Sequence, residues 1–304
     1  MLSEGSFVDL RQISARPLCL ATFHVDVNVG NPKDRPRLKV NLQSLRYVRN
    51  VGLLFRSINL FHPQSRLCVL TSAETDLTPL RMQYQRLDND IDVKALMLAR
   101  SISQQKMVRD NDFSLPIVFA DSDILINGNF QNVFDEDFDV ALTWRTSAHM
   151  PINGGLLILN NQRPNVVRRF FDQFIEVYRE KYLDDAGWYG DQLALRDVCG
   201  VSYREMRDRR LIEVNGCRLL FLPCDRYNYT PADSYASIVE PIYQSAVLHF
   251  KGHRKRLMRP YWEAHLQTLE HNTLLRRARA RLVKIALVWK ANHELPPEVD
   301  GEGE

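Results

Sequence analysis

The chain has 304 residues, enough to bury a complete hydrophobic core. Hydrophobic residues make up 45% and charged residues 25% of the sequence, as in ordinary globular proteins, and the net charge of +3 gives no reason to expect a nucleic-acid partner. The five cysteines form no C-x-x-C pair, which favours buried thiols in a reducing compartment. We see neither a signal-peptide pattern nor a stretch of about 18 apolar residues, so we expect a cytoplasmic protein without a spanning helix.

Short apolar runs alternate with longer amphipathic ones along the sequence. The pattern predicts strands over 18–26, 65–72, 117–126, 138–144 and 154–159, and helices over 42–61, 93–109 and 165–182. This alternation is typical of α/β proteins with a mostly parallel sheet. We therefore expect a single Rossmann-like domain over residues 17–262, with its ligand bound beyond the carboxyl ends of the strands.

Two aspartates interrupt the strand at 117–126, which reads IVFADSDILI. Unpaired carboxylates at the end of a buried strand are unfavourable, and a divalent cation bound by Asp121 and Asp123 would remove that cost. Their hard oxygen atoms suit Mg²⁺ or Mn²⁺, which would keep positions for waters and phosphate oxygens. The simpler alternative is an Asp pair that caps a helix or closes a turn.

Two segments further along combine polar residues with glycines. Asn153, Gly154 and Gly155 precede an apolar run, where paired glycines would let a ligand approach the backbone and the Asn side chain could donate and accept hydrogen bonds. A plain turn before a strand is the alternative. Asp191 and Gln192 open a helical stretch, and Asp191 could equally be the N-cap of that helix.

The segment VLHFKGHRK places His249, Gly252 and Lys255 three residues apart. An imidazole can bind a metal, a glycine amide can face a phosphate and a lysine can neutralise one. Alternatively, His249 is an ordinary core histidine beside a strand.

Taken together, these motifs resemble those of glycosyltransferases with the A-type fold. The resemblance is strongest to the retaining family that includes glycogenin and bacterial lipopolysaccharide galactosyl- and glucosyltransferases. In that family an Asp-x-Asp ends a strand, an Asn-x-Gly segment precedes another, an Asp-Gln pair opens a helix and a His-x-x-Gly-x-x-Lys motif follows. The order and approximate spacing agree across residues 17–262, and the last motif is the most specific.

The resemblance implies a transferase that moves a hexose from a nucleotide sugar, with a UDP-hexose as the expected donor, to a saccharide or glycolipid acceptor with retention. Mn²⁺, or Mg²⁺, would be held by Asp121, Asp123 and His249, and would stabilise the charge of the leaving diphosphate. Asp191 would hold a donor-sugar hydroxyl and Gln192 would lie near the anomeric carbon.

The resemblance also implies which residues contact the rest of the donor. Lys255 and the amide of Gly252 would bind the phosphates, and Arg100 and Lys106 the donor phosphate or sugar, although both could instead lie on a solvated helix face. The full set expected to bind the donor is Thr22, Phe23, Arg100, Lys106, Ser122, Asn153, Gly154, Gly155, Gly252 and Lys255.

Two other classes of protein share parts of this pattern. A sugar-nucleotide pyrophosphorylase would carry a Gly-rich phosphate loop directly after the first strand, but the stretch after Val25 contains only Gly30. A non-catalytic nucleotide-sugar or glycan-binding relative would have no need for three metal ligands.

The C-terminal part is strongly basic. We expect a helical extension over 263–293, in which residues 274–292 carry six Lys and Arg residues and no acidic one. Its apolar residues fall on one helical face. Two interpretations stay open: a helix packed on the domain with solvated arginines, or peripheral contact with the inner face of an anionic membrane. The acidic residues 294–304 are predicted to be disordered.

Overall fold

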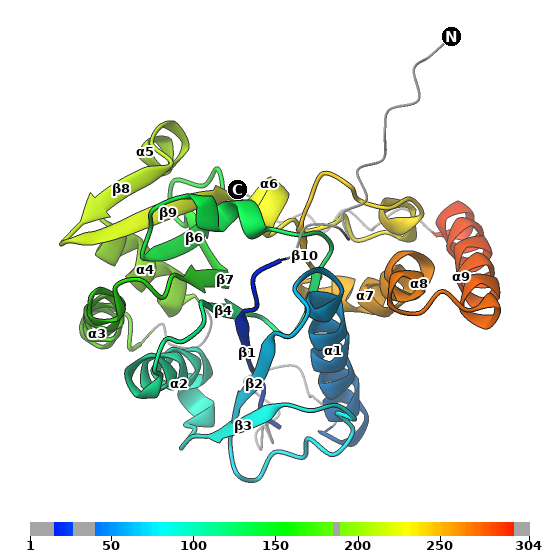
Figure 1. Ribbon diagram of the computed structural model, residues 1–304, viewed down its shortest axis with the longest axis horizontal. Helices are drawn as coiled ribbons and strands as arrows, with labels where there is room; N and C mark the ends of the chain where they lie inside the picture. The colour runs from blue at the N-terminus through cyan, green and yellow to red at the C-terminus, as the bar shows by residue number, and fades with distance from the viewer. Residues whose placement is uncertain (1–14, 27–39, 185–188, 295–304) are drawn as a thin grey trace. The chain divides into compact units, whose positions relative to one another are not determined.

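The computed structural model describes residues 15–26, 40–184 and 189–294 (Figure 1). Internal contacts divide the chain into two compact units, the first formed by residues 1–229 with 243–249 and the second by 230–242 with 250–304. The predicted limits of the catalytic domain and of its extension stay predictions. The predicted disordered tail lies outside the described residues, apart from Glu294.

An eight-stranded mixed sheet forms the centre of the first unit. In spatial order its strands are β3 (Gln85–Asp88), β2 (Arg66–Thr71), β1 (Cys19–Phe23), β4 (Ile117–Ala120), β7 (Ile152–Leu159), β6 (Val140–Trp144), β9 (Cys217–Pro223) and β8 (Leu211–Val214). The first four are parallel, β7 runs antiparallel to both of its neighbours, β9 is parallel to β6, and β8 is antiparallel to β9. The expected α/β fold with a mostly parallel sheet is confirmed.

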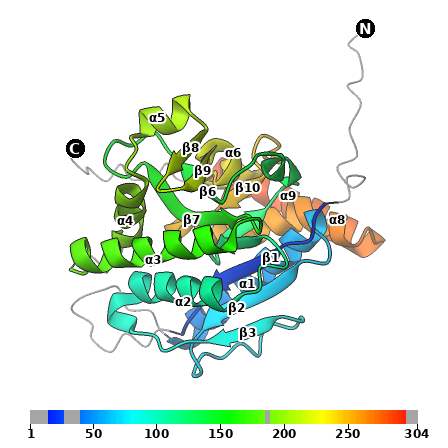
Figure 2. The ribbon, with the colours of Figure 1, turned by 60° about the vertical axis from the view of Figure 1, so that its left-hand side comes forward.

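Helices cover both faces of this sheet. The helices of the first unit are α1 (Val40–Phe61), α2 (Leu96–Asp110), α3 (Pro164–Lys181), α4 (Gly190–Cys199), α5 (Tyr203–Asp208) and α6 (Cys224–Tyr227). Helices α2 and α3 lie side by side over one face, and α1 covers the other (Figures 1 and 2). The 3₁₀ turns η1 (Val93–Ala95) and η2 (Gln131–Asp135) precede α2 and β6.

A separate hydrophobic core lies on each face of the sheet. Along β4, Ile117 and Phe119 belong to the core beneath α2 and α3, whereas Val118 and Ala120 belong to the core beneath α1. A strand buried on both faces needs apolar residues at every position, which explains the uninterrupted run IVFA.

The structure differs from the sequence prediction at the aspartates. The strand predicted over 117–126 is two strands, because β4 ends at Ala120 and the chain turns before β5 (Ile124–Ile126). Strand β5 leaves the main sheet and pairs antiparallel with β10 (Val247–His249). This short pairing joins segments that lie far apart in the sequence.

The sequence analysis missed the β8–β9 hairpin. Its two-residue turn is Asn215-Gly216, with φ values of 50° and 76°, between the paired residues Val214 and Cys217. Asn-Gly between apolar runs is a strong signal for a hairpin, because both turn positions require positive φ. The signal was present in the sequence.

The second unit is helical in its described residues. It contains η3 (Tyr235–Ile238), η4 (Gly252–Arg254), α7 (Lys255–Tyr261), the π-helical turn η5 (Trp262–Leu266), α8 (Gln267–Glu270) and α9 (Leu274–His293). Arg256 links its two ends, because it donates to Asp233 at 2.6 Å and to Glu294 at 2.8 Å. The predicted basic helix over 274–292 is confirmed as α9.

A buried histidine of the first unit makes stability depend on pH. His62 is fully buried, its Nε2 atom lies 3.4 Å from the N–H of Phe130, and burial lowers its pKa from 6.5 to about 4. The unfolded chain therefore takes up the proton first on acidification. The contribution of His62 to the free energy of unfolding should fall below pH 6.5, by about 2 kcal/mol at pH 5, and level off below pH 4.

We expect His62→Gln to lose this contribution. Urea denaturation at pH 7 and pH 5 measures the free energy of unfolding at each pH. Its decrease between the two pH values should be smaller in His62→Gln than in the wild type by the contribution of His62. The exposed His271→Gln variant is the control and should behave like the wild type. Equal pH dependence of His62→Gln and the wild type would contradict the assignment.

Candidate active site

Asp121 and Asp123 lie at the carboxyl end of the central strand β4. The N–H of Asp121 donates to the carbonyl of Gly155 on β7 at 2.9 Å, and the N–H of Ile124 donates back to the carbonyl of Asp121 at 3.2 Å. This turn sends the chain from β4 into β5. Both carboxylates therefore stand at the point where the chain leaves the sheet; the side chain of Asp121 is 29% exposed, and Asp123 is buried.

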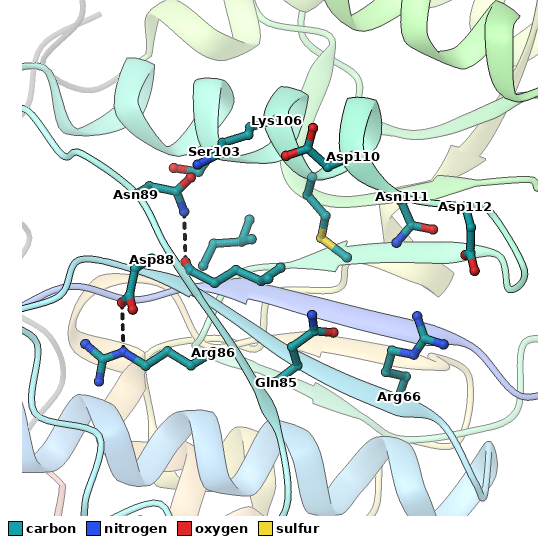
Figure 3. A pocket seen from close by; sticks show the side chains of 13 residues that line it. Arg66, Gln85, Arg86, Asp88, Asn89, Ser103, Lys106, Asp110, Asn111 and Asp112 are labelled. Carbon is teal, nitrogen blue, oxygen red and sulfur yellow. Dashed lines mark hydrogen bonds and ion pairs between the residues drawn. The ribbon is translucent and has the colours of Figure 1, made fainter.

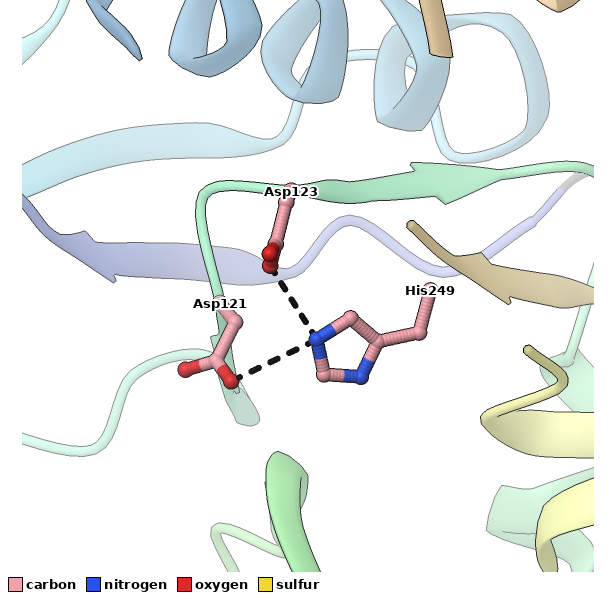
Figure 4. A group of neighbouring side chains, drawn as sticks. All are labelled: Asp121, Asp123 and His249. Atoms are coloured by element: carbon pink, nitrogen blue, oxygen red, sulfur yellow. Dashed lines mark hydrogen bonds and ion pairs between the residues drawn. The ribbon is translucent and has the colours of Figure 1, made fainter. Parts of the chain in front are cut away.

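The pairing of β5 with β10 brings His249 to the two aspartates. His249 lies opposite Ile124 in this pairing, and its Nε2 atom is 3.1 Å from Asp123 Oδ1 and 3.6 Å from Asp121 Oδ2 (Figure 4). The three ligand atoms lie within 4.8 Å of one another. Two carboxylates with one imidazole are a donor set that suits Mn²⁺. The residues thus fit the predicted metal site.

A buried ion triad adjoins the cluster. Arg100 on α2 donates to Asp121 Oδ1 at 2.5 Å and also to Asp191 Oδ2 on α4. The two oxygens of Asp121 are thus divided, one toward the arginine and one toward His249. Asp121, Asp123 and Asp191 together carry three negative charges against one on Arg100, which leaves two for a divalent cation to balance.

Asp191 is placed for a role in the site. It lies in the first turn of α4, but the N-cap is Tyr189, whose side chain makes no capping hydrogen bond, so the alternative interpretation of Asp191 as the N-cap is wrong. Burial raises the pKa of Asp191, while Arg100 opposes that effect. Its Oδ1 atom has no hydrogen-bond partner among the described residues.

The two glycines lie against side chains of the site. Gly154 and Gly155 lie inside β7, not in a turn before it. A Cβ atom at Gly155 would lie 2.7 Å from His249 Nδ1 and 3.1 Å from Asp121 Oδ2, and one at Gly154 would lie 2.8 Å from Asp191 Oδ2. Side chains of the site occupy the space that a Cβ atom at either glycine would need, and contact of these glycines with the donor stays a prediction.

Three polar side chains near the cluster were missed by the sequence analysis. Asn228 Oδ1 lies 2.7 Å from His249 Nδ1, and Asn228 Nδ2 donates to Thr143 Oγ1 at 2.8 Å. Arg145, in the loop after β6, donates to Gln192 Oε1 at 3.2 Å. None of the three belongs to a sequence motif, so no local pattern could have predicted their role in the site.

The predicted residues Asn153, Thr22 and Phe23 lie on the two strands that flank β4. The side-chain Oδ1 atom of Asn153, on β7, accepts a hydrogen bond from the N–H of Gly155 at 3.1 Å. Thr22 and Phe23 end β1, next to β4, and the buried hydroxyl of Thr22 has no hydrogen-bond partner among the described residues. Burial also lowers the pKa of His24, directly after this strand. An unsatisfied buried hydroxyl is what a ligand at this end of the sheet would satisfy.

The remaining residues predicted to bind the donor are Lys106, Ser122, Gly252 and Lys255. Lys106 lines a cavity of about 470 Å³ between α2 and strands β2 and β3, and none of the cluster residues lines it (Figure 3). Ser122 lies in the turn between the aspartates. Gly252 and Lys255 belong to the second unit, and their contact with the donor stays a prediction.

No protein-family model matches the sequence, and a search of curated proteins finds no significant match. Solved structures do match. The glycosyltransferase GlyE of Streptococcus pneumoniae aligns with a TM-score of 0.50 and 14% identity over 86% of this chain and 65% of its own. The bifunctional glycosyltransferase WbbM aligns with a TM-score of 0.50 and 13% identity over 88% of this chain and 51% of its own. The chain therefore has the glycosyltransferase A-type fold.

The close approach of His249 to β7 gives a testable consequence. In Gly155→Ala, the new methyl group would clash with the side chains of His249 and Asp121 and displace the imidazole, so we expect a large loss of Mn²⁺ affinity. Isothermal titration calorimetry of the full-length protein with Mn²⁺ measures this affinity. The control is Gly52→Ala on α1, where the nearest atom is 3.5 Å away and helix propensity favours alanine. Unchanged affinity in Gly155→Ala would show that His249 is not a ligand.

Proposed function

We propose that this protein is a metal-dependent glycosyltransferase that moves a hexose from a nucleotide sugar, a UDP-sugar, to a saccharide acceptor with retention. The observation that carries the proposal is the cluster of Asp121, Asp123 and His249 beside the Arg100–Asp191 pair at the carboxyl end of β4. In sheets of this type ligands bind at that end. The fold is shared with two proteins that are named as glycosyltransferases.

Asp121, Asp123 and His249 would hold Mn²⁺ or Mg²⁺. When bound there, the ion supplies Lewis-acid stabilisation of the negative charge that grows on the leaving diphosphate. Arg100 keeps one oxygen of Asp121 engaged, so that the other faces the ion. Its guanidinium also orients Asp191 and offsets part of the local negative charge.

Asp191 and Gln192 would act on the donor sugar. The Oδ1 atom of Asp191 can accept a hydrogen bond from a sugar hydroxyl. Gln192, held by Arg145, would lie near the anomeric carbon, where its amide is too weak a nucleophile for a stable covalent intermediate. Retention would then follow from attack of the acceptor hydroxyl on the face that the diphosphate leaves, with the departing phosphate taking the hydroxyl proton.

We also propose the remaining donor contacts that the sequence predicts. Thr22 and Phe23 would contact the base or ribose, and Gly252 and Lys255 the diphosphate.

The two alternative functions, a sugar-nucleotide pyrophosphorylase and a non-catalytic binding protein, can be distinguished from a transferase by the nucleotide that is released from a nucleotide sugar. A transferase releases nucleoside diphosphate, a pyrophosphorylase releases nucleoside triphosphate when pyrophosphate is added, and a binding protein releases neither.

The first test uses hydrolysis of a panel of nucleotide sugars with Mn²⁺ present. Asp123→Ala should lose release of the nucleoside diphosphate altogether, because it removes a ligand from the cluster. The matched control is Asp208→Ala, an exposed aspartate on α5, which should retain wild-type turnover. Full turnover of Asp123→Ala in the presence of a chelator would overturn the metal-dependent mechanism.

Helix α9 supports a second part of the proposal, contact with a membrane that carries a glycolipid acceptor. Within the described residues no helix combines the length and apolar character needed to cross a membrane. One face of α9 packs on the second unit through Ala280 and Leu287. The opposite face exposes large apolar side chains: Leu275 (80%), Leu282 (67%), Ile285 (66%) and Trp289 (61%).

The charge of α9 supports an anionic membrane as the partner of this exposed face. Arg277, Arg281 and Lys284 are exposed along one side of it, and α9 contains no acidic residue. An apolar face with basic flanks fits the interface of an anionic bilayer, where each basic side chain contributes about 1 kcal/mol. The predicted apolar face is thus present and turned outward, which the packed-helix alternative does not explain.

Sedimentation with liposomes tests the membrane contact. The wild type should sediment with phosphatidylserine liposomes at low salt, less at high salt, and not with phosphatidylcholine. Leu282→Ser/Ile285→Ser should lose binding and keep its thermal unfolding midpoint, because both side chains are exposed. Arg204→Glu/Arg207→Glu on α5 is the charge control and should bind normally. A wild type that ignores anionic liposomes at both salt concentrations would exclude the contact.

A further inference from the structure

A chain of three buried side chains begins at a backbone carbonyl of β7. The carbonyl oxygen of Asn153 can only accept hydrogen bonds, and Thr143 Oγ1 on β6 lies 2.8 Å from it. The single hydroxyl proton of Thr143 is therefore donated to that carbonyl. A backbone group, which cannot change its role, fixes the direction of this hydrogen bond.

The next link is the side chain of Asn228. Because the proton of Thr143 is already donated, its oxygen must accept a hydrogen bond from the second neighbour, 2.8 Å away, which is Asn228 Nδ2. The amide nitrogen of Asn228 thus faces Thr143, and its oxygen faces the other way. That oxygen lies 2.7 Å from His249 Nδ1.

An amide oxygen can only accept, so His249 Nδ1 must carry a hydrogen. In the neutral imidazole this leaves a lone pair on Nε2, the atom that lies 3.1 Å from Asp123 and 3.6 Å from Asp121. A lone pair that faces two carboxylates is unfavourable without a cation between them. With a cation there, it is the third ligand.

We propose that Asn228 and Thr143 are positioning residues that select the Nδ1–H tautomer of His249, so that Nε2 is ready to bind the metal. The inference rests on the proposed function only in that a divalent cation occupies the cluster. Second-neighbour hydrogen bonds of this kind orient the imidazole and raise its basicity as a ligand.

The backbone around Asn228 holds the relay in place. Asn228 follows the last turn of α6, where its N–H donates to the carbonyl of Cys224 at 2.9 Å. The N–H of Tyr229 donates to the carbonyl of Val247 at 3.0 Å, and the N–H of His249 donates to the carbonyl of Tyr229 at 2.7 Å. Asn228 and His249 are therefore fixed to each other through the main chain, and both side chains are buried.

Nuclear magnetic resonance of the full-length protein with ¹⁵N-labelled histidine reads the tautomer directly. Long-range ¹H–¹⁵N correlations, assigned with a His249→Gln variant, should show Nδ1 protonated and Nε2 unprotonated in the Mg²⁺-bound wild type. Asn228→Ala should lose this preference. A wild type with the hydrogen on Nε2 would overturn the proposal.

The second test measures Mn²⁺ affinity. The protein is titrated with Mn²⁺, and electron paramagnetic resonance detects the ion that stays free. Asn228→Ala should bind Mn²⁺ about 10–100-fold more weakly, as is typical for the loss of such a partner. Asn228→Asp keeps an acceptor for Nδ1–H and should keep the tautomer. Thr143→Val should weaken binding, whereas Thr143→Ser, which keeps the hydroxyl, should restore it.

A structural role alone would give a different pattern. The control Asn160→Ala removes another buried asparagine, and should lower the unfolding midpoint without changing Mn²⁺ affinity. If Asn228→Ala and Thr143→Val, both folded, bound Mn²⁺ within twofold of the wild type, the relay would have no positioning role. Normal Mn²⁺ binding and tautomer without sugar transfer would instead overturn the proposed function and leave the relay supported.

Discussion

Excess negative charge at the buried end of β4 is the constraint on which the site depends. Asp121, Asp123 and Asp191 converge there, and the guanidinium of Arg100 offsets only part of their charge. Burial of uncompensated charge opposes folding, and a buried ion pair seldom adds net stability. Such an arrangement is therefore better explained by the ligand that it recruits than by the stability of the fold. A divalent cation would balance the two negative charges that Arg100 leaves uncompensated.

The strand β7 makes room for this chemistry. Glycine in a strand interior weakens the sheet, yet β7 holds two adjacent glycines at its centre. Their missing side chains leave the space that the imidazole of His249 and the carboxylate of Asp191 occupy. The antiparallel direction of β7 also brings the carbonyl of Asn153 to Thr143, where the relay to His249 begins. One strand thus supplies both the space and the orientation.

The fold class and three residues of the site could be predicted from the sequence, because local patterns of residues indicate them. Apolar runs and helical periodicity gave the α/β fold, and the order of the motifs singled out Asp121, Asp123 and His249, which the fold brings together. Lys106 was misplaced for a geometric reason. Six residues on a helix turn through about 240° relative to Arg100, so the two side chains cannot face the same site. Asn228 and Arg145 act through contacts between distant segments, which no local pattern encodes.

The pairing of β5 with β10 also sets the order of events during protein synthesis. Asp123 and His249 are separated by 126 positions, so the ribosome makes the aspartates long before their imidazole. At about 5–20 residues per second the delay is roughly 6–25 s. During that interval a nascent chain can pair β1, β2 and β4, but it lacks the third ligand. All three residues of the cluster can therefore meet only after β10 has been made, and a product truncated before residue 247 would carry the two aspartates without the strand that brings His249 to them.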